Sequence, residues 1–269
     1  MAPRAIWSGA ISFGLVNVPV KLYSATRSLD VRFNQLHAVD GARIRQKRVC
    51  ALDGLEVGAE EIVKGYEISP DRYVTITQAE LDSVQATATR QIEIEEFVDL
   101  AEIDPLHFES SYYLVPEKLA VKSYALLHRA MSEASRVAIG RVVLRSKEYL
   151  AAIRPLGNAL TMATMRFADE IVARDQLVGL PDAETEVSER ELAIARQLVE
   201  SLSAPFLPER YRDTYREAVL AMIERKADGE VVVSAPERVG QAKAVDLMAA
   251  LEASLAAAKA RKAATAVVA

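Results

Sequence analysis

The chain has 269 residues, of which 51% are hydrophobic and 26% charged, and its formal net charge at pH 7 is −5. This composition is typical of a soluble globular protein with a sizeable core, and it excludes a disordered chain and a uniformly basic surface. No apolar run approaches the roughly 20 residues of a membrane span. The single cysteine, Cys50, excludes an internal disulfide, so we expect a cytoplasmic protein without a membrane partner.

Basic residues are concentrated at the beginning of the chain. The first fifty residues hold eight Lys/Arg and two Asp/Glu, whereas the remainder holds 25 Lys/Arg and 36 Asp/Glu. The densest run is Arg43-Ile44-Arg45-Gln46-Lys47-Arg48, which contains no acid. Such a run is either a solvated strand face or a surface that contacts phosphates, since a cleft can concentrate positive potential even on an acidic protein.

Strand patterns dominate the first 170 residues. Alternating apolar and polar residues, or runs rich in β-branched and aromatic residues, predict strands within residues 6–23, 62–66, 73–76, 91–95, 110–115, 137–144, 149–153 and 160–167. Pro19 lacks the amide hydrogen that a strand interior needs, which predicts that its strand lies at a sheet edge or at a bulge. Many short strands around few helices indicate a sandwich or a barrel.

The basic run lies in a region of predicted extended structure. Residues 32–35 and 43–49 are predicted as two extended pieces joined by the turn signal Asp40-Gly41. Alternation along the second piece would place Arg43, Arg45 and Lys47 on one face.

Two helices are predicted among these strands. Thr77 and Glu80 form a capping box at the start of a short helix. Residues 117–134 predict a longer helix whose core-facing stripe consists of Ala120, Tyr124, Leu127 and Met131.

Helix patterns replace the strand patterns from residue 176. Residues 176–187 read as a linker, and Ser188 with Glu191 forms a second capping box. The apolar stripes that follow are Leu192, Ala195, Val199 and Leu202 in one helix and Tyr211, Tyr215, Val219 and Met222 in the next. Two helices cannot bury both stripes by themselves, so they must pack on the barrel or on another subunit.

The last forty residues contain two further predicted elements. Residues 230–233 predict a short strand, and Val245, Met248, Leu251 and Leu255 predict a last amphipathic helix. The alanine-rich end with Lys259, Arg261 and Lys262 is predicted to be frayed.

No sequence pattern of a catalytic or metal site is found. The chain lacks the glycine spacing of a phosphate-binding loop and the GxSxG nucleophile signature. Asp53 stands where a CxxC pair with Cys50 would have its second sulfur, so we expect neither a metal nor a cofactor. The chain is therefore interpreted as a binding or assembly protein and not as an enzyme.

Residues 4–25, RAIWSGAISFGLVNVPVKLYSA, resemble the N-terminal signature of the bacterial Ku proteins. Later blocks of that family are matched in order by RIRQKRVC (43–50), IVKGYE (62–67), VAIGRVVLR (137–145) and PERYRDTY (208–215). The resemblance extends to about residue 255. It implies an α+β fold, in which a Ku-type β-barrel carries an extended DNA-encircling bridge insertion and is followed by a helical C-terminal arm.

The resemblance also implies a domain organisation. Residues 1–175 would form the barrel core, with the bridge at about 27–73. Residues 176–229 would form a helical dimerisation arm, and 230–269 a C-terminal strand, a helix and a short flexible tail. Asp53 and this short tail depart from the family, many of whose members have a second cysteine and some a long lysine-rich tail.

The function implied by the resemblance is sequence-independent binding of double-stranded DNA ends by a ring-shaped homodimer in non-homologous end joining. The partner implied besides DNA is an ATP-dependent DNA ligase, recruited and stimulated at the bacterial nucleoid. The candidate DNA-binding residues are Arg32, Arg43, Arg45, Lys47, Arg48 and Lys64. The candidate residues of the dimer arm are Leu192, Val199, Tyr211, Tyr215, Val219 and Met222.

Two other functions remain open at this point. One is a non-catalytic oligomeric interaction scaffold whose basic ribbon is merely solvated. The other is a single-strand binder of the barrel type, which needs aromatic platforms for stacking. Tyr112 and Tyr113 are the only adjacent aromatic residues, and alternation sends them to opposite faces of their strand, which weakens that case.

Overall fold

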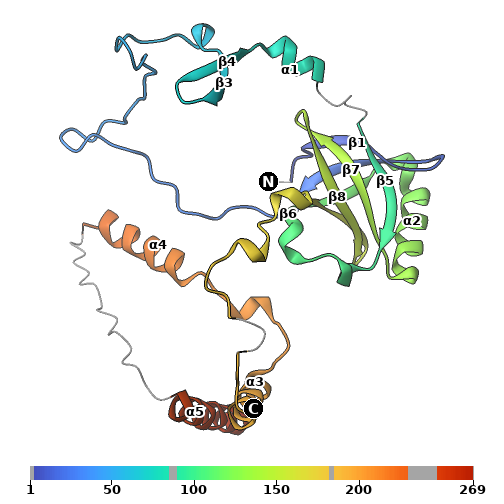
Figure 1. The fold of residues 1–269 in the computed structure, drawn as a ribbon, viewed down its shortest axis with the longest axis vertical. Helices are drawn as coiled ribbons and strands as arrows, with labels where there is room; N and C mark the ends of the chain where they lie inside the picture. The colour runs from blue at the N-terminus through green and yellow to red at the C-terminus, as the bar shows by residue number, and fades with distance from the viewer. Residues whose placement is uncertain (1–2, 85–89, 182–184, 230–246, 269) are drawn as a thin grey trace. The chain divides into compact units, whose positions relative to one another are not determined.

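The computed structural model describes residues 3–84, 90–181, 185–229 and 247–268 (Figure 1). The chain divides into two compact units, one of residues 1–29 and 34–176 and the other of residues 30–33 and 177–269. The first unit contains a closed β-barrel and the second is built from helices. The predicted α+β fold class is therefore confirmed.

Seven strands close the barrel. Their order around it is β1-β2-β6-β9-β8-β7-β5, and all neighbours are antiparallel except β1 and β5. The parallel pairing of Ala10 with Gln91 and of Ile11 with Ile92 closes the barrel, which decides between the predicted sandwich and barrel. The strands are β1 (Trp7–Phe13), β2 (Val16–Ser24), β5 (Gln91–Val98), β6 (Phe108–Pro116), β7 (Val137–Leu144), β8 (Lys147–Leu156) and β9 (Ala159–Met165).

The barrel core follows from the period-two patterns. Val18, Val20 and Leu22 of β2 are fully buried, while the residues between them are not. Helix α2 (Val121–Ala134) covers this core with the predicted stripe, because Ala120, Tyr124, Leu127 and Met131 are all buried.

The side chain of Tyr124 fastens α2 to the barrel. Its hydroxyl donates a hydrogen bond to the Leu114 carbonyl oxygen and accepts one from the Leu160 N–H, both at 2.6 Å. Leu114 and Leu160 are paired residues of β6 and β9, so the hydroxyl bridges the two strands. Burial raises the pKa of this phenol, which therefore stays neutral.

The prediction that Pro19 marks an edge strand or a bulge is wrong. Strand β2 lies between β1 and β6 in the closed barrel, and Pro19 is in regular register opposite Ala10. The Pro19 carbonyl accepts the Glu117 N–H at 3.0 Å, one residue beyond the end of β6. Because the backbone nitrogen and carbonyl of one strand residue point to the same side, the missing N–H faces the place where the β6 ladder ends.

The remaining elements of the first unit lie between β2 and β5, connect the barrel strands or follow β9. Strands β3 (Lys64–Ser69) and β4 (Arg72–Ile76) form a two-stranded sheet, and α1 (Gln78–Val84) follows with the predicted capping box of Thr77 and Glu80. The short 3₁₀ turns of this unit are η1 (Ala59–Glu61), η2 (Leu100–Glu102), η3 (Pro105–His107), η4 (Lys118–Ala120), η5 (Ala168–Glu170) and η6 (Arg174–Gln176), and a further one, η7 (Pro208–Arg210), belongs to the second unit.

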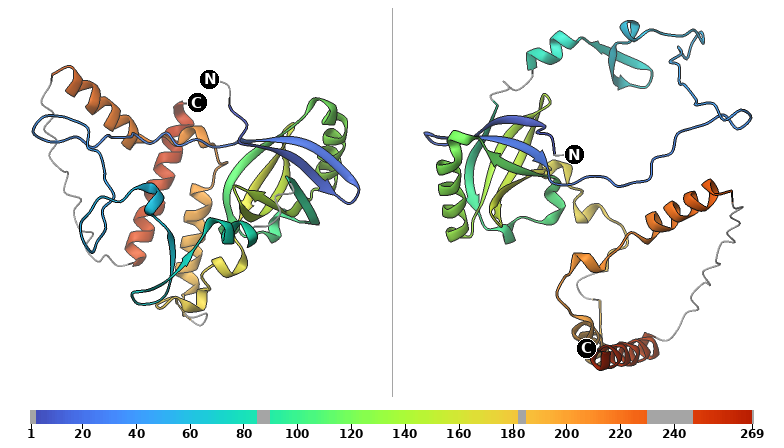
Figure 2. Two further views of the ribbon diagram at one scale, coloured as in Figure 1. Left: turned by 90° about the horizontal axis from the view of Figure 1, so that it is seen from above. Right: turned by 180° about the vertical axis from the view of Figure 1, so that it is seen from behind.

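The second unit contains α3 (Glu189–Leu202), α4 (Thr214–Ala227) and α5 (Leu247–Val268). Helices α3 and α5 lie side by side, with Arg190 Nη2 3.8 Å from Glu252 Oε1 (Figure 2). The Ser188 capping box of α3 is confirmed, since Ser188 N–H reaches Glu191 Oε2 at 3.0 Å. None of the helices in the described ranges combines the length and the apolar composition needed to cross a bilayer.

Two expectations for this unit are corrected. Tyr211 does not belong to the second helix, because α4 begins only at Thr214, after Asp213 caps the Arg216 N–H at 2.9 Å. The end of the chain is helical to Val268 and not frayed, as its alanine-rich composition favours helix. The predicted strand at 230–233 and Val245 lie outside the described residues.

Candidate nucleic-acid interface

The candidate interface lies on the long insertion between β2 and β5. We call residues 27–73 the bridge segment. None of its residues is buried, and large apolar side chains such as Phe33, Val39 and Leu52 are between 70% and 95% exposed. The bridge segment therefore has no hydrophobic core of its own, and its side chains are available to partners.

The first part of the bridge segment folds back on itself at Asp40 and Gly41. Ile44 N–H donates to the Gln35 carbonyl at 3.0 Å, and His37 N–H donates to the Ala42 carbonyl at 2.8 Å. Gly41 has φ +71°, a conformation that glycine adopts without strain. The predicted Asp40-Gly41 turn is thus confirmed.

A second narrow turn follows and explains the departure at Asp53. Cys50 N–H donates to the Leu55 carbonyl at 2.8 Å, and the Asp53 carboxylate accepts the Leu55 N–H at 3.0 Å. Asp53 therefore has the role of a turn residue. Within the described ranges, no cluster of three or more His, Cys, Asp or Glu is arranged to hold a metal ion.

The predicted strands of the basic run do not form. Residues 32–35 and 43–49 belong to no sheet, and they pair only through the isolated bridges Leu36–Arg43 and Val49–Glu56. The prediction of regular extended pieces is wrong because neither piece has a continuous partner strand. The alternation that would align Arg43, Arg45 and Lys47 consequently has no ladder to enforce it.

The six candidate cations fall into two groups. Arg43 donates to Asn34 Oδ1, Lys47 pairs with Glu56 Oε2 at 2.6 Å, and Lys64 of β3 donates to Gln78 Oε1 at 3.2 Å. The side chains of Arg32, Arg45 and Arg48 are exposed and form no hydrogen bond or ion pair with the described part of the chain. These three guanidinium groups are free to contact an anionic ligand.

Charge is divided along the insertion. The cations from Arg27 to Arg48 precede residue 50, whereas most acids of the insertion, those from Asp53 to Asp82, follow it. The structure adds one cation to the candidate set, Arg72, which is exposed beside the left-handed Asp71 at the turn between β3 and β4. The predicted strands at 62–66 and 73–76 end close to it, which was a sequence signal that could have identified it.

The candidate residues of the dimer arm differ in how far they are exposed. Leu192, Val219 and Met222 are half-buried, whereas Val199 and Tyr215 are 66% and 78% exposed. The Tyr211 ring stacks on Phe206 with the ring centroids 5.7 Å apart. The arm therefore leaves large apolar side chains uncovered.

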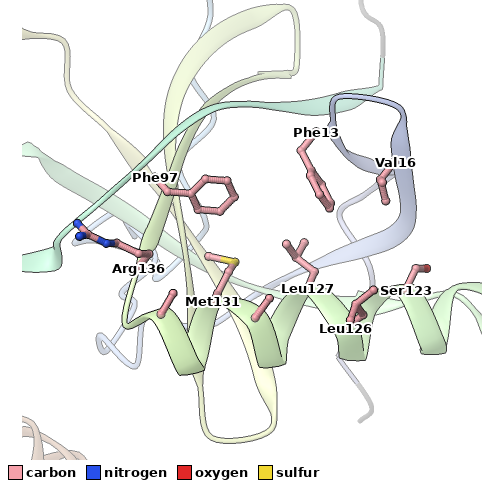
Figure 3. A pocket seen from close by; sticks show the side chains of 10 residues that line it. Phe13, Val16, Phe97, Ser123, Leu126, Leu127, Met131 and Arg136 are labelled. Carbon is pink, nitrogen blue, oxygen red and sulfur yellow. The ribbon is translucent and has the colours of Figure 1, made fainter.

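An apolar groove beside α2 has a different character from the bridge segment. The groove has a volume of about 520 Å³. It is lined by Phe13, Phe97, Leu127 and Met131, as Figure 3 shows. The charged group at its rim, Arg136, pairs with Asp99 at 2.9 Å. A groove of this composition is unsuited to phosphates, because a charged group buried in it would lose its hydration without a compensating partner.

Comparisons with known proteins agree with this fold. A family model described as the Ku70/Ku80 beta-barrel domain matches residues 12–194. The non-homologous end joining protein Ku of Anaeromyxobacter sp. (strain K) is 54% identical over 259 residues, which cover 96% of this chain and 87% of that protein. The protein of the same name from Archaeoglobus fulgidus is 42% identical over 95% of this chain and 100% of its own length.

A third relative is longer than this chain. The non-homologous end joining protein Ku of Symbiobacterium thermophilum is 46% identical over 98% of this chain, which spans 65% of that protein. These names assign the relatives to end joining and to no enzyme class, in agreement with the expectation that the chain is not an enzyme. From the extent of the family match and of these identities, the chain belongs to the Ku family of non-homologous end joining proteins.

Proposed function

We propose that this protein binds the ends of double-stranded DNA without reading sequence, as a ring-shaped homodimer in non-homologous end joining. The observation that carries the proposal is the bridge segment, which exposes the guanidinium groups of Arg32, Arg45 and Arg48, none of which has a partner among the described residues. Guanidinium groups on such a segment neutralise phosphates and release counterions, which gives affinity.

The bridge segment is suited to phosphates and not to base edges. Base readout requires a helix or a paired ribbon inserted in a groove, with side chains aimed at base edges. Residues 32–35 and 43–49 are neither helix nor sheet, and phosphate contacts carry no sequence information. A closed ring would need positive charge only on its inner wall, which accommodates the net charge of −5.

The second copy in the proposal is supported by uncovered apolar side chains. The bridge segment has no buried residue, and Val199 and Tyr215 of the arm are mostly exposed. Large exposed apolar surfaces are typical of protein interfaces. In this proposal residues 176–229 are the dimerisation arm, with Leu192, Val199, Tyr211, Tyr215, Val219 and Met222 among its contacts.

A ligase belongs to the proposal for a chemical reason. Joining two ends requires new phosphodiester bonds, which binding does not supply, and an ATP-dependent DNA ligase forms them. The protein would hold the ends and recruit that ligase at the bacterial nucleoid. The competing function is a non-catalytic oligomeric interaction scaffold whose basic residues are merely solvated.

Charge reversal of the basic run tests the phosphate interface. Replacing Arg43, Arg45 and Lys47 together by Glu should abolish binding to a linear duplex, because six cations per dimer become anions. Sedimentation should still give a dimer, since these exposed side chains bury nothing. A variant that retains its affinity would favour the scaffold function.

Substitution in the arm tests the second copy. Tyr215→Ser should weaken dimerisation, measured by sedimentation equilibrium, if the exposed ring of Tyr215 packs on the partner. Thr214→Ser changes the neighbouring residue at the same helix end and serves as the control. Wild-type association of Tyr215→Ser would remove Tyr215 from the dimer interface.

A further inference from the structure

A small pocket lies beside the start of β1 and the turn that joins β7 to β8, elements labelled in Figure 1. Its volume is about 200 Å³, and it is lined by three aromatic side chains, Trp7, Tyr112 and Tyr149. Each of them is half-buried and packs against the barrel core. We call it the aromatic pocket. Its rings are held in place by the core and present their remaining surface to the pocket.

Two cations accompany these rings. Arg145 lines the aromatic pocket and is exposed. Lys147 lies on the same face of β8 as Tyr149, with its Nζ 5.0 Å from the centroid of the Tyr149 ring. Glu109 also lines the pocket, but in the described part of the chain it forms no ion pair with Arg145 or Lys147. Both positive groups are therefore available to an anion.

The backbone that carries Arg145 is strained. Arg145 and Ser146 have φ of +51° and +75°, in a two-residue turn where glycine or asparagine is the usual choice. Strained backbone conformations persist where a side chain is needed in a particular place, so the turn directs attention to Arg145. A glycine at this position would remove the strain but also the cation.

The combination of flat rings and cations selects a ligand class. Nucleobases stack on aromatic side chains irrespective of sequence, and a neighbouring Arg or Lys neutralises the phosphate. We propose that the aromatic pocket binds one unpaired nucleotide of a single-stranded overhang, with the base on the rings and the phosphate at Arg145 and Lys147. This inference rests on the proposed function, because it supposes that the protein binds DNA ends.

The size of the aromatic pocket restricts the ligand further. Its volume lies below the roughly 300–1,000 Å³ of pockets that enclose drug-sized molecules. One flat ring fits this size better than a larger ligand does. The three aromatic residues lie far apart in the sequence, so a search for adjacent aromatic residues does not find this stacking site.

The chain offers a direct probe of the aromatic pocket, because Trp7 is its only tryptophan. The full-length protein is titrated with two hairpin-capped duplexes that each have one free end, one blunt and one with a short thymidine overhang. Trp7 emission should be quenched by the overhang duplex and not by the blunt one. Stacking of a single base should favour the overhang duplex by roughly five- to a hundredfold in affinity.

Two glycine variants separate the cation from the strain. Arg145→Gly and Ser146→Gly each relieve one positive φ, so both should raise the midpoint of thermal unfolding. Only Arg145→Gly should lose most of the preference for the overhang. Tyr149→Leu retains apolar packing but removes the π-face, so it should also lose the preference while binding the blunt duplex normally. Tyr113→Leu, on the opposite face of β6 from Tyr112, is its control.

The outcomes distinguish this inference from the proposed function. Normal binding of the blunt duplex, with no overhang preference and no change in Trp7 emission, would overturn the aromatic pocket alone. Retention of the preference by Arg145→Gly and Tyr149→Leu would also overturn it and leave a pocket that only closes the barrel core. A wild-type protein that binds neither duplex would contradict the proposed function as well.

Discussion

One cation of the proposed phosphate interface, Lys47, is paired with an acidic residue, Glu56. Lys47 Nζ lies 2.6 Å from Glu56 Oε2, and the two side chains are 71% and 57% exposed. While the pair holds, the Glu56 carboxylate competes with a phosphate for the Lys47 ammonium group. Glu56→Gln removes that competitor, so we predict that it strengthens DNA binding, although it alters no cation.

The magnitude follows from counterion release. Each neutralised phosphate adds about 0.9 to the slope of log affinity against log salt. In a homodimer the substitution would free two Lys47 side chains to contact phosphates, so the slope should steepen by up to about 1.8. The gain in DNA affinity therefore shrinks about tenfold between 50 and 200 mM salt. Stability should hardly change, because an exposed ion pair contributes only about 0–1 kcal/mol.

Fluorescence anisotropy with a short linear duplex, repeated over a range of salt concentrations, measures this slope. Glu60→Gln is the matched control, because it removes the same charge from the same insertion, and no cation of the described residues pairs with Glu60. Arg45→Ala should reduce the slope by about 1.8, since the Arg45 side chain has no partner to lose in the part of the chain that the structure describes. Equal effects of Glu56→Gln and Glu60→Gln would refute the reasoning and leave only a general change of charge.

Three further predictions concern the fold. Tyr124→Phe leaves the Leu114 carbonyl and the Leu160 N–H without the hydroxyl, so urea unfolding should show that the free energy of unfolding falls by about 2–4 kcal/mol. A decrease below about 0.5 kcal/mol would mean that the two strands close directly on each other. Gly140→Ala would place a Cβ 2.1 Å from the Glu93 carbonyl oxygen and should lower the free energy of unfolding by about 1–3 kcal/mol. The Cβ of Gly65→Ala would meet Tyr73 at 3.4 Å, so this variant should lose little stability. Equal decreases for the two variants would contradict this account of β5–β7 packing. Hydrogen bonds from Ser188 lower the pKa of Glu191, so the stability that the Glu191 carboxylate adds to α3 is present above the ordinary Glu pKa of about 4.3 and is lost as pH falls through the lowered pKa. The difference in far-ultraviolet circular dichroism between wild type and Glu191→Ala should therefore vanish in acid. A difference that persists in acid would exclude the capping box as its source.

Local patterns were sufficient for most of the barrel. The barrel strands either alternate apolar and polar residues, as β2 does, or are rich in β-branched residues, as β7 is, and turn residues such as Gly157-Asn158 separate them, so their positions were predictable. The closure between β1 and β5 was not predictable, because it joins residues 81 positions apart and depends on the register of every strand between them. The same limit applies to Pro19, whose tolerance depends on where β6 ends.

The candidate interface was predictable in composition but not in geometry. The basic run is visible in the sequence, yet its alternation predicts strands only if a partner strand exists, and the bridge segment provides none over residues 43–49. The pairing of Lys47 with Glu56 arises from the turn at Asp53, which brings together side chains nine positions apart. In the arm, Asp213 was a capping signal that could have excluded Tyr211 from α4.

The central claim is that DNA passes through a closed ring, and topology tests it most directly. A gel shift compares a linear duplex with a covalently closed circle of the same sequence and length. A ring can thread onto the free end of the linear duplex but not onto the circle, so the account predicts binding to the linear form alone. Equal binding to both would contradict encirclement and favour an open cationic surface.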